Sequence, residues 1–279
     1  MRWTRAFATT VHDPDSRLVP LLGLHAEALA AAHAIATASV TSQTSATTLA
    51  ALRAAGVEIT IEERRGIGQA RRAAVQAAVD AGASSILYCD LDRWLHWRQS
   101  WPDELGGVFD RLESGRPTPL YGCLGRSTRA FGTHPKVQVA CEDATNRAVS
   151  AAFRRRCDVT AGAAWLSLEG AQLILSRSVE VTNATDAEWP AIAWCVDPRR
   201  VVQTWNEGLE FETATFYPAE VEAAGGLGPW IRQAYDTAPA WATRLALASA
   251  SAAAVVRVLG EEPVFDPRRK NDAGAGTRH

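Results

Sequence analysis

The sequence predicts an α/β fold in which a mostly parallel sheet is flanked by helices. Short apolar runs alternate with helical stretches rich in Leu and Ala between residues 5 and 89, and glycines close several of those stretches. Strands that alternate with helices at this spacing form parallel sheets covered on both faces. Ligands of such sheets bind at the carboxyl ends of the strands, so functional residues are expected just after each strand.

The first half of the chain is predicted as four strands connected by three helices, and the fourth strand ends at an acidic turn. A strand over 5–11 leads through a turn at His12-Asp13-Pro14-Asp15 to a helix over 18–36. Gly56 and Gly82 follow later helical stretches, as glycine commonly does at helix ends. The remaining predicted elements are a strand at 36–41, a helix at 45–55, a strand at 57–62, a helix at 68–81 and a strand at 85–89.

The second half is less regular. Pro102 after Trp101 indicates a helix start, because proline is favoured in the first turn. An apolar run over 245–256 is too short to span a bilayer and is expected to be a packed surface helix. The other predicted elements are a strand at 120–124, a helix at 137–155, a Trp-rich mixed region at 165–205, late strands at 201–205 and 209–213, and helices at 219–235 and 240–259.

The composition limits which binding partners and which cellular compartment we expect for this protein. The formal net charge of −2 gives no electrostatic argument for nucleic acid or an anionic membrane as the main partner. The five cysteines are odd in number, widely spaced and without a CxxC pair, so neither a disulfide framework nor a zinc knuckle is predicted. We expect a cytoplasmic protein without a signal region or transmembrane segment, and a homo-oligomer stays open.

The strand at 85–89 ends in two carboxylates, Asp90 and Asp92, which form an Asp-x-Asp (DxD) motif around Leu91. At a strand terminus the chain leaves the pleat, so both side chains can turn toward one ligand. Mg²⁺ and Mn²⁺ prefer hard oxygen ligands and leave room for diphosphate oxygens. An isolated motif of this kind is more often a solvated loop or a helix cap, but its position after a buried strand favours a metal site.

Gly66, Gly68 and Arg71 form a second candidate site at the start of the helix predicted at 68–81. Glycines allow a close backbone approach, the helix N-terminus carries partial positive charge, and arginine adds cationic donors. The pattern lacks the third glycine of a dinucleotide fingerprint and follows the third strand, not the first. Glycines that serve the turn and arginines solvated on the helix are the structural alternative.

In their order along the chain, these motifs resemble the GT-A-fold nucleotide-sugar glycosyltransferases, especially those like family 2. The resemblance rests on Thr9-Thr10-Val11-His12-Asp13-Pro14, on Gly66-x-Gly68-x-x-Arg71 and on Tyr88-Cys89-Asp90-Leu91-Asp92, and it extends to about residue 215. It implies a mixed, mostly parallel GT-A-type sheet with C-terminal helices. Residues 1–265 would form one domain, made of a nucleotide-sugar half (1–115), an acceptor half (116–215) and C-terminal helices (216–265), with a mobile tail at 266–279.

The resemblance also implies site roles. In that family the first-strand loop and the Gly/Arg helix start contact the nucleotide, and the acidic pair holds a metal ion that bridges the diphosphate. The implied nucleotide-sugar contacts are Thr9, Thr10, His12, Gly66, Gly68, Arg71 and Asp90, and the implied ligands of Mn²⁺ or Mg²⁺ are Asp90 and Asp92. One departure is the end of the second strand, Val40-Thr41-Ser42, where relatives commonly place an acid for the nucleobase.

Asp186 and Glu188 lie where similar enzymes place an acceptor-site acid, after the metal motif. Transfer to a hydroxyl with inversion needs a base, and a carboxylate in a partly desolvated cleft can have its pKa raised to suit. Asp186 is the first choice and Glu188 the second. Alternatively, Thr185 or Asp186 caps a helix that begins near Glu188.

Glu210 and Glu212 share one face of the strand predicted at 209–213. We expect that face to be toward solvent, and the alternative is that one of the two carboxylates faces the acceptor. No late histidine offers a third metal ligand, because the last one before the tail is His134.

The predicted activity is that of a hexosyltransferase which moves a sugar from a nucleoside diphosphate sugar to a hydroxyl of a small molecule or glycan, with a divalent metal and with inversion. A retaining enzyme would keep the donor site without the base. A sugar-phosphate nucleotidyltransferase is an alternative, although it usually has a longer Gly-rich loop after the first strand. A non-catalytic nucleotide-sugar-binding protein on the same fold is another.

Overall fold

A computed structural model describes residues 3–63 and 66–260 and contains a seven-stranded mixed sheet. The strands lie in the order β3-β2-β1-β4-β6-β5-β7. Strands β1 to β4 pair in parallel, β6 is antiparallel to both of its neighbours, and β7 is parallel to β5. The predicted mixed, mostly parallel sheet is confirmed. The strands are β1 (Arg5–Val11), β2 (Ile35–Thr41), β3 (Glu58–Glu62), β4 (Ser85–Cys89), β5 (Tyr121–Arg126), β6 (Ala163–Ser167) and β7 (Val201–Asn206).

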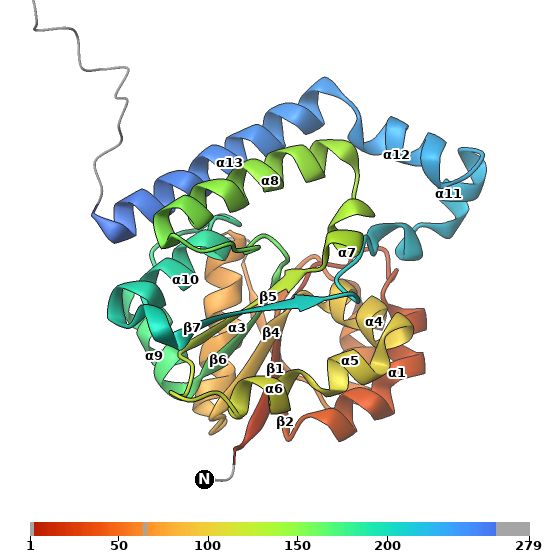
Figure 1. Ribbon diagram of the computed structural model, residues 1–279. Helices are drawn as coiled ribbons and strands as arrows, with labels where there is room; N and C mark the ends of the chain where they lie inside the picture. The colour runs from red at the N-terminus through yellow and green to blue at the C-terminus, as the bar shows by residue number, and fades with distance from the viewer. Residues whose placement is uncertain (1–2, 64–65, 261–279) are drawn as a thin grey trace, which may run out of the picture.

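Helices cover both faces of this sheet (Figure 1). Several begin where the sequence predicts: Ser45 caps α2 by accepting from the Thr48 N–H, and Pro102 lies in the first turn of α5. The helices are α1 (Val19–Ala32), α2 (Ala46–Ala54), α3 (Ile67–Asp80), α4 (Leu91–Ser100), α5 (Pro102–Gly106), α6 (Val108–Glu113), α7 (Thr128–Gly132), α8 (Lys136–Phe153), α9 (Leu168–Arg177), α10 (Thr185–Val196), α11 (Pro218–Ala223), α12 (Leu227–Tyr235) and α13 (Ala238–Leu259), with short 3-10 helices η1 (Pro198–Arg200) and η2 (Thr213–Phe216).

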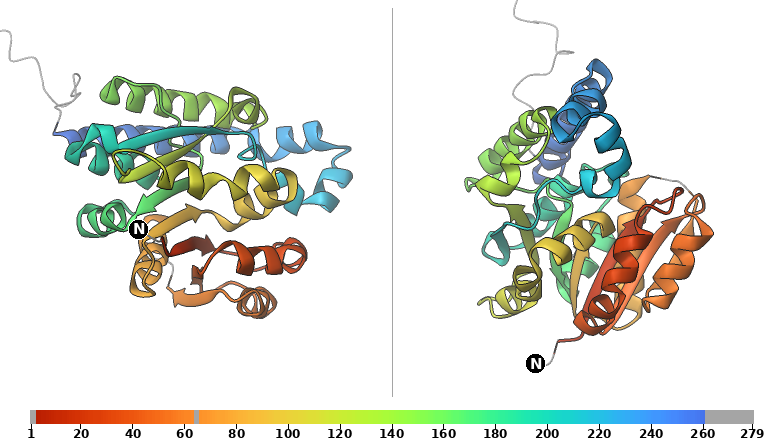
Figure 2. Two further views of the ribbon diagram at one scale, coloured as in Figure 1. Left: turned by 60° about the horizontal axis from the view of Figure 1, so that its bottom comes forward. Right: turned by 90° about the vertical axis from the view of Figure 1, so that its right-hand side faces the viewer.

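Two apolar layers form the core, one on each face of the sheet. Successive strand residues point to opposite faces, so Phe7 and Leu87 join the layer under α1, α2 and α4, whereas Ala8 and Tyr88 join the layer under α3, α8 and α10. Figure 2 shows the sheet between these helical layers. This arrangement fixes the strand ends on which the site is built.

Two predicted late elements are wrong. Residues 209–213 do not form a strand: β7 ends at Asn206, and Gly208 then packs against the Trp97 ring so closely that a Cβ would collide with it. The helix predicted at 219–235 is two helices, because Gly225 and Gly226 separate them with φ of 83° and 115°. Such positive φ values interrupt a right-handed helix.

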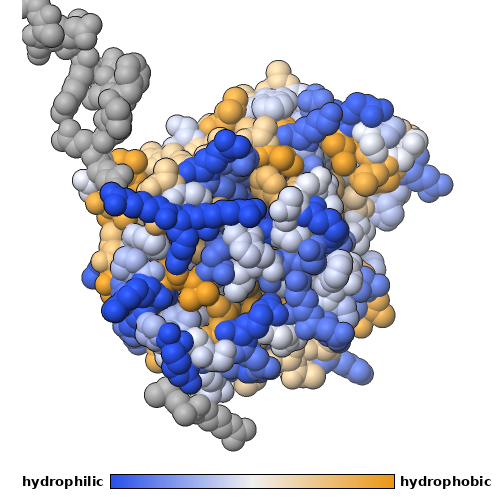
Figure 3. Space-filling model, in the orientation of Figure 1, coloured by the Kyte–Doolittle hydropathy of each residue, from blue (hydrophilic) through white to orange (hydrophobic). Residues whose placement is uncertain are grey.

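Helix α13 runs beside α8 and packs against α8 and α10 (Figure 1). The predicted apolar run at 245–256 is its middle part. Within the described ranges it is the one helix whose length and apolar composition would suffice to cross a membrane, and its most apolar window is only 17% buried. Exposed Leu227 and Leu245 belong to this end of the fold. On the face seen in Figure 3, apolar side chains form small patches between hydrophilic ones. The predicted tail at 266–279 lies outside the described residues.

Candidate functional site

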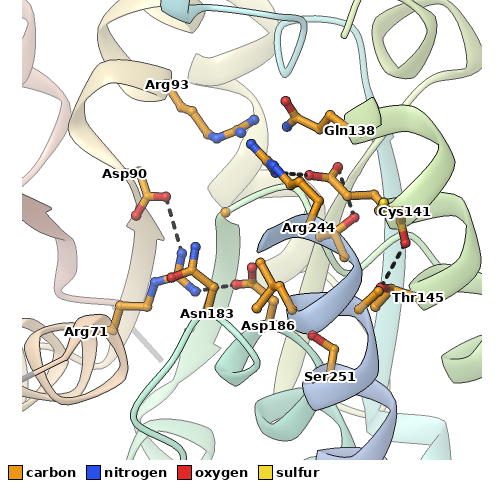
Figure 4. Close-up of a pocket in the computed structure, with 15 residues that line it drawn as sticks. Arg71, Asp90, Arg93, Gln138, Cys141, Thr145, Asn183, Asp186, Arg244 and Ser251 are labelled. Atoms are coloured by element: carbon orange, nitrogen blue, oxygen red, sulfur yellow. Dashed lines mark hydrogen bonds and ion pairs between the residues drawn. The ribbon is translucent and has the colours of Figure 1, made fainter. Parts of the chain in front are cut away.

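Two neighbouring cavities lie at the carboxyl ends of the strands. The larger, about 670 Å³, is lined by residues at the ends of β1, β2 and β3, by the start of α3 and by α13. The smaller, about 120 Å³, is lined by residues of α3, α4, α8, α10 and α13 (Figure 4). Asn183, Arg244 and Leu247 line both cavities, so the two adjoin.

Asp90 ends β4 as the N-cap residue of α4 and faces the smaller cavity. Its Oδ1 accepts a 2.6 Å hydrogen bond from the Tyr88 hydroxyl, and its Oδ2 lies 3.3 Å from Arg71 Nη2. Gly162 makes room for this carboxylate, since a Cβ there would lie 2.7 Å from Oδ2. Burial and the neighbouring Asp90 charge raise the pKa of Tyr88, so the phenol stays a neutral donor to Asp90.

Asp92 lies in the first turn of α4 and lines neither cavity. Residues two apart on a helix do not share a face, which separates its direction from that of Asp90. Burial, then the negative charges of Glu212 and Asp90, raise the pKa of Asp92 to about 7. Over the described ranges, no three His, Cys, Asp or Glu side chains form a group able to hold a metal ion by themselves.

Glu212 lies next to this acidic pair, and its predicted position on a solvent-facing strand is wrong. It is only 5% exposed, because residues 209–213 form an irregular segment folded against the body of the protein. Its Oε1 lies 3.4 Å from Arg93 Nη2, and its buried Oε2 has no hydrogen-bond partner within the described chain. An unpaired buried carboxylate oxygen is costly and favours a cation or water beside it.

Arg71 joins α3 to α10 at the wall of the smaller cavity. Its guanidinium is almost fully buried; Nη1 donates to Thr185 Oγ1 at 3.0 Å and to Asp186 Oδ1. Burial raises the pKa of Asp186 to about 6, with Arg71 opposing the shift and Asp90 adding to it. The cavity therefore contains a carboxyl group that changes charge close to neutral pH.

Glu188 is not brought to either cavity. Its buried carboxylate accepts from the Val179 and Glu180 amides at 3.0 and 3.1 Å and pairs with Arg257 at 3.0 Å. These bonds tie the segment before α10 to the helix. Neither Thr185 nor Asp186 caps α10, whose N-cap residue is Ala184 without a side-chain bond.

The two glycines at the start of α3, Gly66 and Gly68, lack side chains and so allow residues 180–182 to pack closely against the helix. The Gly68 N–H donates to Val181 O at 3.0 Å, and a Cβ on Gly66 would lie 2.5 Å from the same oxygen. A Cβ on Gly68 would collide with Glu180 O. Gly66 lines the larger cavity and Gly68 does not, so these residues shape a wall made partly by residues 180–182.

The first strand contributes Thr10 and His12 to the larger cavity. Thr10 Oγ1 lies 3.2 Å from the Tyr88 hydroxyl, and His12 Nδ1 lies 2.8 Å from Thr41 Oγ1. Thr9 is fully buried and lines neither cavity, because alternation along the strand turns its side chain away from that of Thr10.

Arg93, Glu142, Asn183 and Arg244 line the smaller cavity, and the sequence interpretation did not assign them to the site. Arg244 Nη1 lies 3.0 Å from Glu142 Oε1, which connects α13 to α8 beside the cavity. For Arg244, the only signal in the sequence was its position directly before the apolar run at 245–256. Nothing in the sequence indicates that this helix reaches the strand ends.

Comparison with known proteins gives structural likeness only. No protein-family model and no curated protein sequence matches the chain. Crystal structures of glucosyl-3-phosphoglycerate synthase from Mycobacterium tuberculosis are similar in fold. The complex with phosphoglyceric acid has a TM-score of 0.57 at 9% identity, over 94% of this chain and 82% of that chain. Another structure of that enzyme gives 0.56 at 9% identity over the same shares, and its complex with Mn²⁺, UDP-glucose and phosphoglyceric acid gives 0.54 at 8% identity over 94% and 81%. The chain therefore has the GT-A-type fold of nucleotide-diphospho-sugar transferases.

Proposed function

We propose that this protein is a glycosyltransferase that moves a sugar from a nucleoside diphosphate sugar to a hydroxyl acceptor with the help of a divalent metal. The observation that carries this proposal is the smaller cavity. There Asp90, Arg71 and Asp186 lie side by side, next to a cavity large enough for a nucleoside.

The donor site is the larger cavity together with its border with the smaller one. Its volume of about 670 Å³ lies within the range typical of small-molecule sites. The nucleoside would occupy it beside Thr10 and His12. The diphosphate would lie toward the start of α3, where the helix N-terminus and the guanidinium groups of Arg71 and Arg244 favour negative charge.

A metal ion would be held at Asp90. Asp90 supplies hard oxygen atoms at the smaller cavity, whereas Asp92 lies in the first turn of α4 and lines neither cavity. The Oε2 atom of Glu212 is a buried oxygen without a partner within the described chain. Burial raises the pKa of Asp92, and the negative charges of Glu212 and Asp90 add to the shift. A cation bound nearby would offset this negative charge. Asp90 would hold Mn²⁺ or Mg²⁺ at the smaller cavity, and Asp92 would become a second ligand if its side chain turned toward Asp90. The bound ion would stabilise the charge of the leaving diphosphate. The similar synthase was solved in complex with Mn²⁺, UDP-glucose and phosphoglyceric acid.

Asp186 is the proposed base of an inverting transfer. Its carboxylate takes the proton of the acceptor hydroxyl while that oxygen forms a bond to the anomeric carbon and the bond from this carbon to the diphosphate breaks. A pKa of about 6 leaves the group mostly ionised at pH 7 and still basic enough to accept the proton. Arg71 positions this carboxylate and favours its charged form.

Donor binding and turnover test the proposal together. We would measure the binding of UDP- and GDP-sugars by calorimetry with and without Mn²⁺, and follow products by mass spectrometry in the wild type and in Asp90→Asn. Asp103→Asn, a change of an exposed carboxylate on α5, is the matched control. Metal-dependent binding followed by slow hydrolysis of the donor, lost in Asp90→Asn alone, supports the proposal. Release of pyrophosphate from a nucleoside triphosphate and a sugar phosphate would instead indicate a nucleotidyltransferase, and binding without turnover a non-catalytic protein.

A further inference from the structure

Two polar side chains in the larger cavity have no partner in the described protein. Ser39 is 2% exposed, lines the cavity, and its Oγ forms no hydrogen bond with the described residues. Glu62, the last residue of β3, lines the same cavity, and its carboxylate takes part in no hydrogen bond or ion pair with them. Buried polar groups are normally paired, so a ligand that bonds to Ser39 is favoured there. Glu62 is half-buried, and its carboxylate is available to the same ligand.

The sheet register places both side chains on one face. Ser39 pairs with Thr60 and Thr41 with Glu62, so Ser39, Thr41 and Glu62 point to the same side. That side is covered by α3, because Thr37, also in phase with Ser39, donates to Ala74 O at 2.9 Å. A strand spacing of about 4.8 Å and a rise of about 6.6 Å over two residues put the Cα atoms of Ser39 and Glu62 roughly 8 Å apart. A two-ring base is longer than a single-ring base and therefore spans this distance more fully.

A carboxylate can only accept hydrogen bonds, which selects among the bases. Guanine presents two adjacent donors, N1–H and the 2-amino group, and so matches both carboxylate oxygens. Uracil presents one N–H between two carbonyls, so it can donate to only one carboxylate oxygen. Adenine and cytosine place a ring nitrogen acceptor beside their amino group. A guanine held by Glu62 leaves O6 and N7 on the side from which a serine hydroxyl can donate.

The register also shows which residue supplies a carboxylate in place of the acid that is absent from the end of β2. Thr41 occupies that position, and its Oγ1 is already bonded to His12 at 2.8 Å. Glu62 is the register neighbour of Thr41 on the adjacent strand, so a carboxylate still reaches this corner of the sheet.

We infer that the larger cavity takes the base of a guanine nucleotide, with Glu62 reading the N1–H and 2-amino edge and Ser39 bonding the opposite edge. The inference rests on the proposed function, because it assigns the base of the proposed donor. Both residues determine specificity and neither acts in the chemical step.

Calorimetry with GDP, IDP, UDP and ADP in the presence of Mn²⁺ tests this inference. IDP differs from GDP only by lacking the 2-amino group. Wild-type protein should bind GDP at least about tenfold more tightly than UDP, ADP or IDP. A tenfold difference in affinity is what one additional hydrogen bond to a charged group is expected to contribute. Glu62→Gln should remove most of the preference for GDP over IDP and leave UDP affinity within about twofold. Glu58→Gln is the matched control, since this exposed glutamate lies on the same face at the other end of β3.

The possible outcomes distinguish a failure of the guanine assignment from a failure of the proposed glycosyltransferase function. If UDP binds as tightly as GDP, or if Glu62→Gln weakens all four nucleotides equally, the guanine assignment is wrong and the donor site stands. If no nucleotide binds at all, the proposed function fails and this inference fails with it. The comparison of GDP with IDP in the wild type needs no variant, so it decides the question even if Glu62→Gln folds poorly.

Discussion

Arg71 on α3 and Asp186 on α10 form an ion pair across 115 positions of the chain. The pair is almost shielded from water, and Arg71 also reaches Asp90 Oδ2 at 3.3 Å. One guanidinium thus connects the acid at the end of β4 with the proposed base. Breaking this connection affects charge, position and folding together, so the predictions that follow separate these effects.

Asp186→Asn is expected to lower kcat for sugar transfer by about 100-fold or more, because a positioned base contributes about 10² to 10⁴. Donor affinity should change little, since the amide keeps the shape of the side chain. Steady-state kinetics together with donor calorimetry check both statements. Full activity of this variant would remove the assigned base and favour a retaining reaction.

Glu188→Gln should lower the stability of the protein and leave kcat unchanged, which is the opposite of the effect expected for Asp186→Asn. The carboxylate accepts two backbone amides and pairs with Arg257, so its loss is expected to cost about 2 kcal/mol of stability. Thermal unfolding should show a lower Tm, and kcat measured well below that temperature should stay near the wild-type value. A large fall in kcat with an unchanged Tm would return Glu188 to the list of candidate bases.

The rate should depend on pH through Asp186. The base must be ionised, so kcat/KM is expected to rise with pH and to level off above a pKa of about 6. Replacing Arg71 with Gln removes the positive charge that opposes the shift, which moves this inflection to higher pH. A profile from pH 5 to 8 in the wild type and in Arg71→Gln checks the direction. An inflection that moves to lower pH would contradict the assignment.

Removal of divalent metal by EDTA should abolish transfer and weaken the binding of the diphosphate donor, and Mn²⁺ or Mg²⁺ should restore both. Asp92→Asn is expected to raise the Mn²⁺ concentration needed for half-maximal activity, because one hard oxygen ligand is lost. Activity titrations with Mn²⁺ measure this shift. Full activity in excess EDTA would exclude the proposed role of Asp90 and Asp92.

Gly68→Ala should destabilise the protein by about 1 to 3 kcal/mol, because the added methyl meets Glu180 O with no room to move. Gly23→Ala is the matched control. Gly23 lies inside α1 with nothing within 4 Å of an added Cβ, so this change should stabilise the protein by about 0.5 to 1 kcal/mol. Chemical denaturation of both variants tests the contrast, and equal effects would show that the 180–181 segment yields easily.

Acid should destabilise the protein through His33. This residue stacks on Phe7 at a ring distance of 5.4 Å, and burial lowers its pKa from 6.5 to about 4. The unfolded chain therefore binds the proton more readily, and stability is lost as pH falls from 6.5 toward 4. The full difference corresponds to roughly 3 kcal/mol. His33→Phe should flatten this part of the curve of unfolding free energy against pH, and an unchanged slope would assign the acid sensitivity to other groups.

Part of this molecule follows from local patterns in the chain. Alternating apolar runs and the glycines that follow helices, Gly56 and Gly82, predicted the first four strands and their helices, because periodicity and helix termination act over a few residues. The position of Asp90 after a buried strand was readable for the same reason. Even so, local pattern failed at 209–213, where apolar alternation suggested a strand but the close packing of Gly208 on Trp97 directs the chain away from the sheet.

Local sequence patterns were therefore enough to predict the sheet, the acid at the end of β4 and the resemblance to nucleotide-sugar transferases. The tertiary structure alone decided which side chains meet: that Arg71 pairs with Asp186, that Glu62 stands beside Thr41, that Arg244 reaches the cavities from α13, and that Glu188 is used to hold a neighbouring segment. The reason is the distance along the chain over which each interaction acts. Side-chain periodicity and the hydrogen bonds of helix caps are set by residues that are neighbours in the chain. Burial, charge pairing and cavity shape depend on residues that approach one another only when the whole chain has folded.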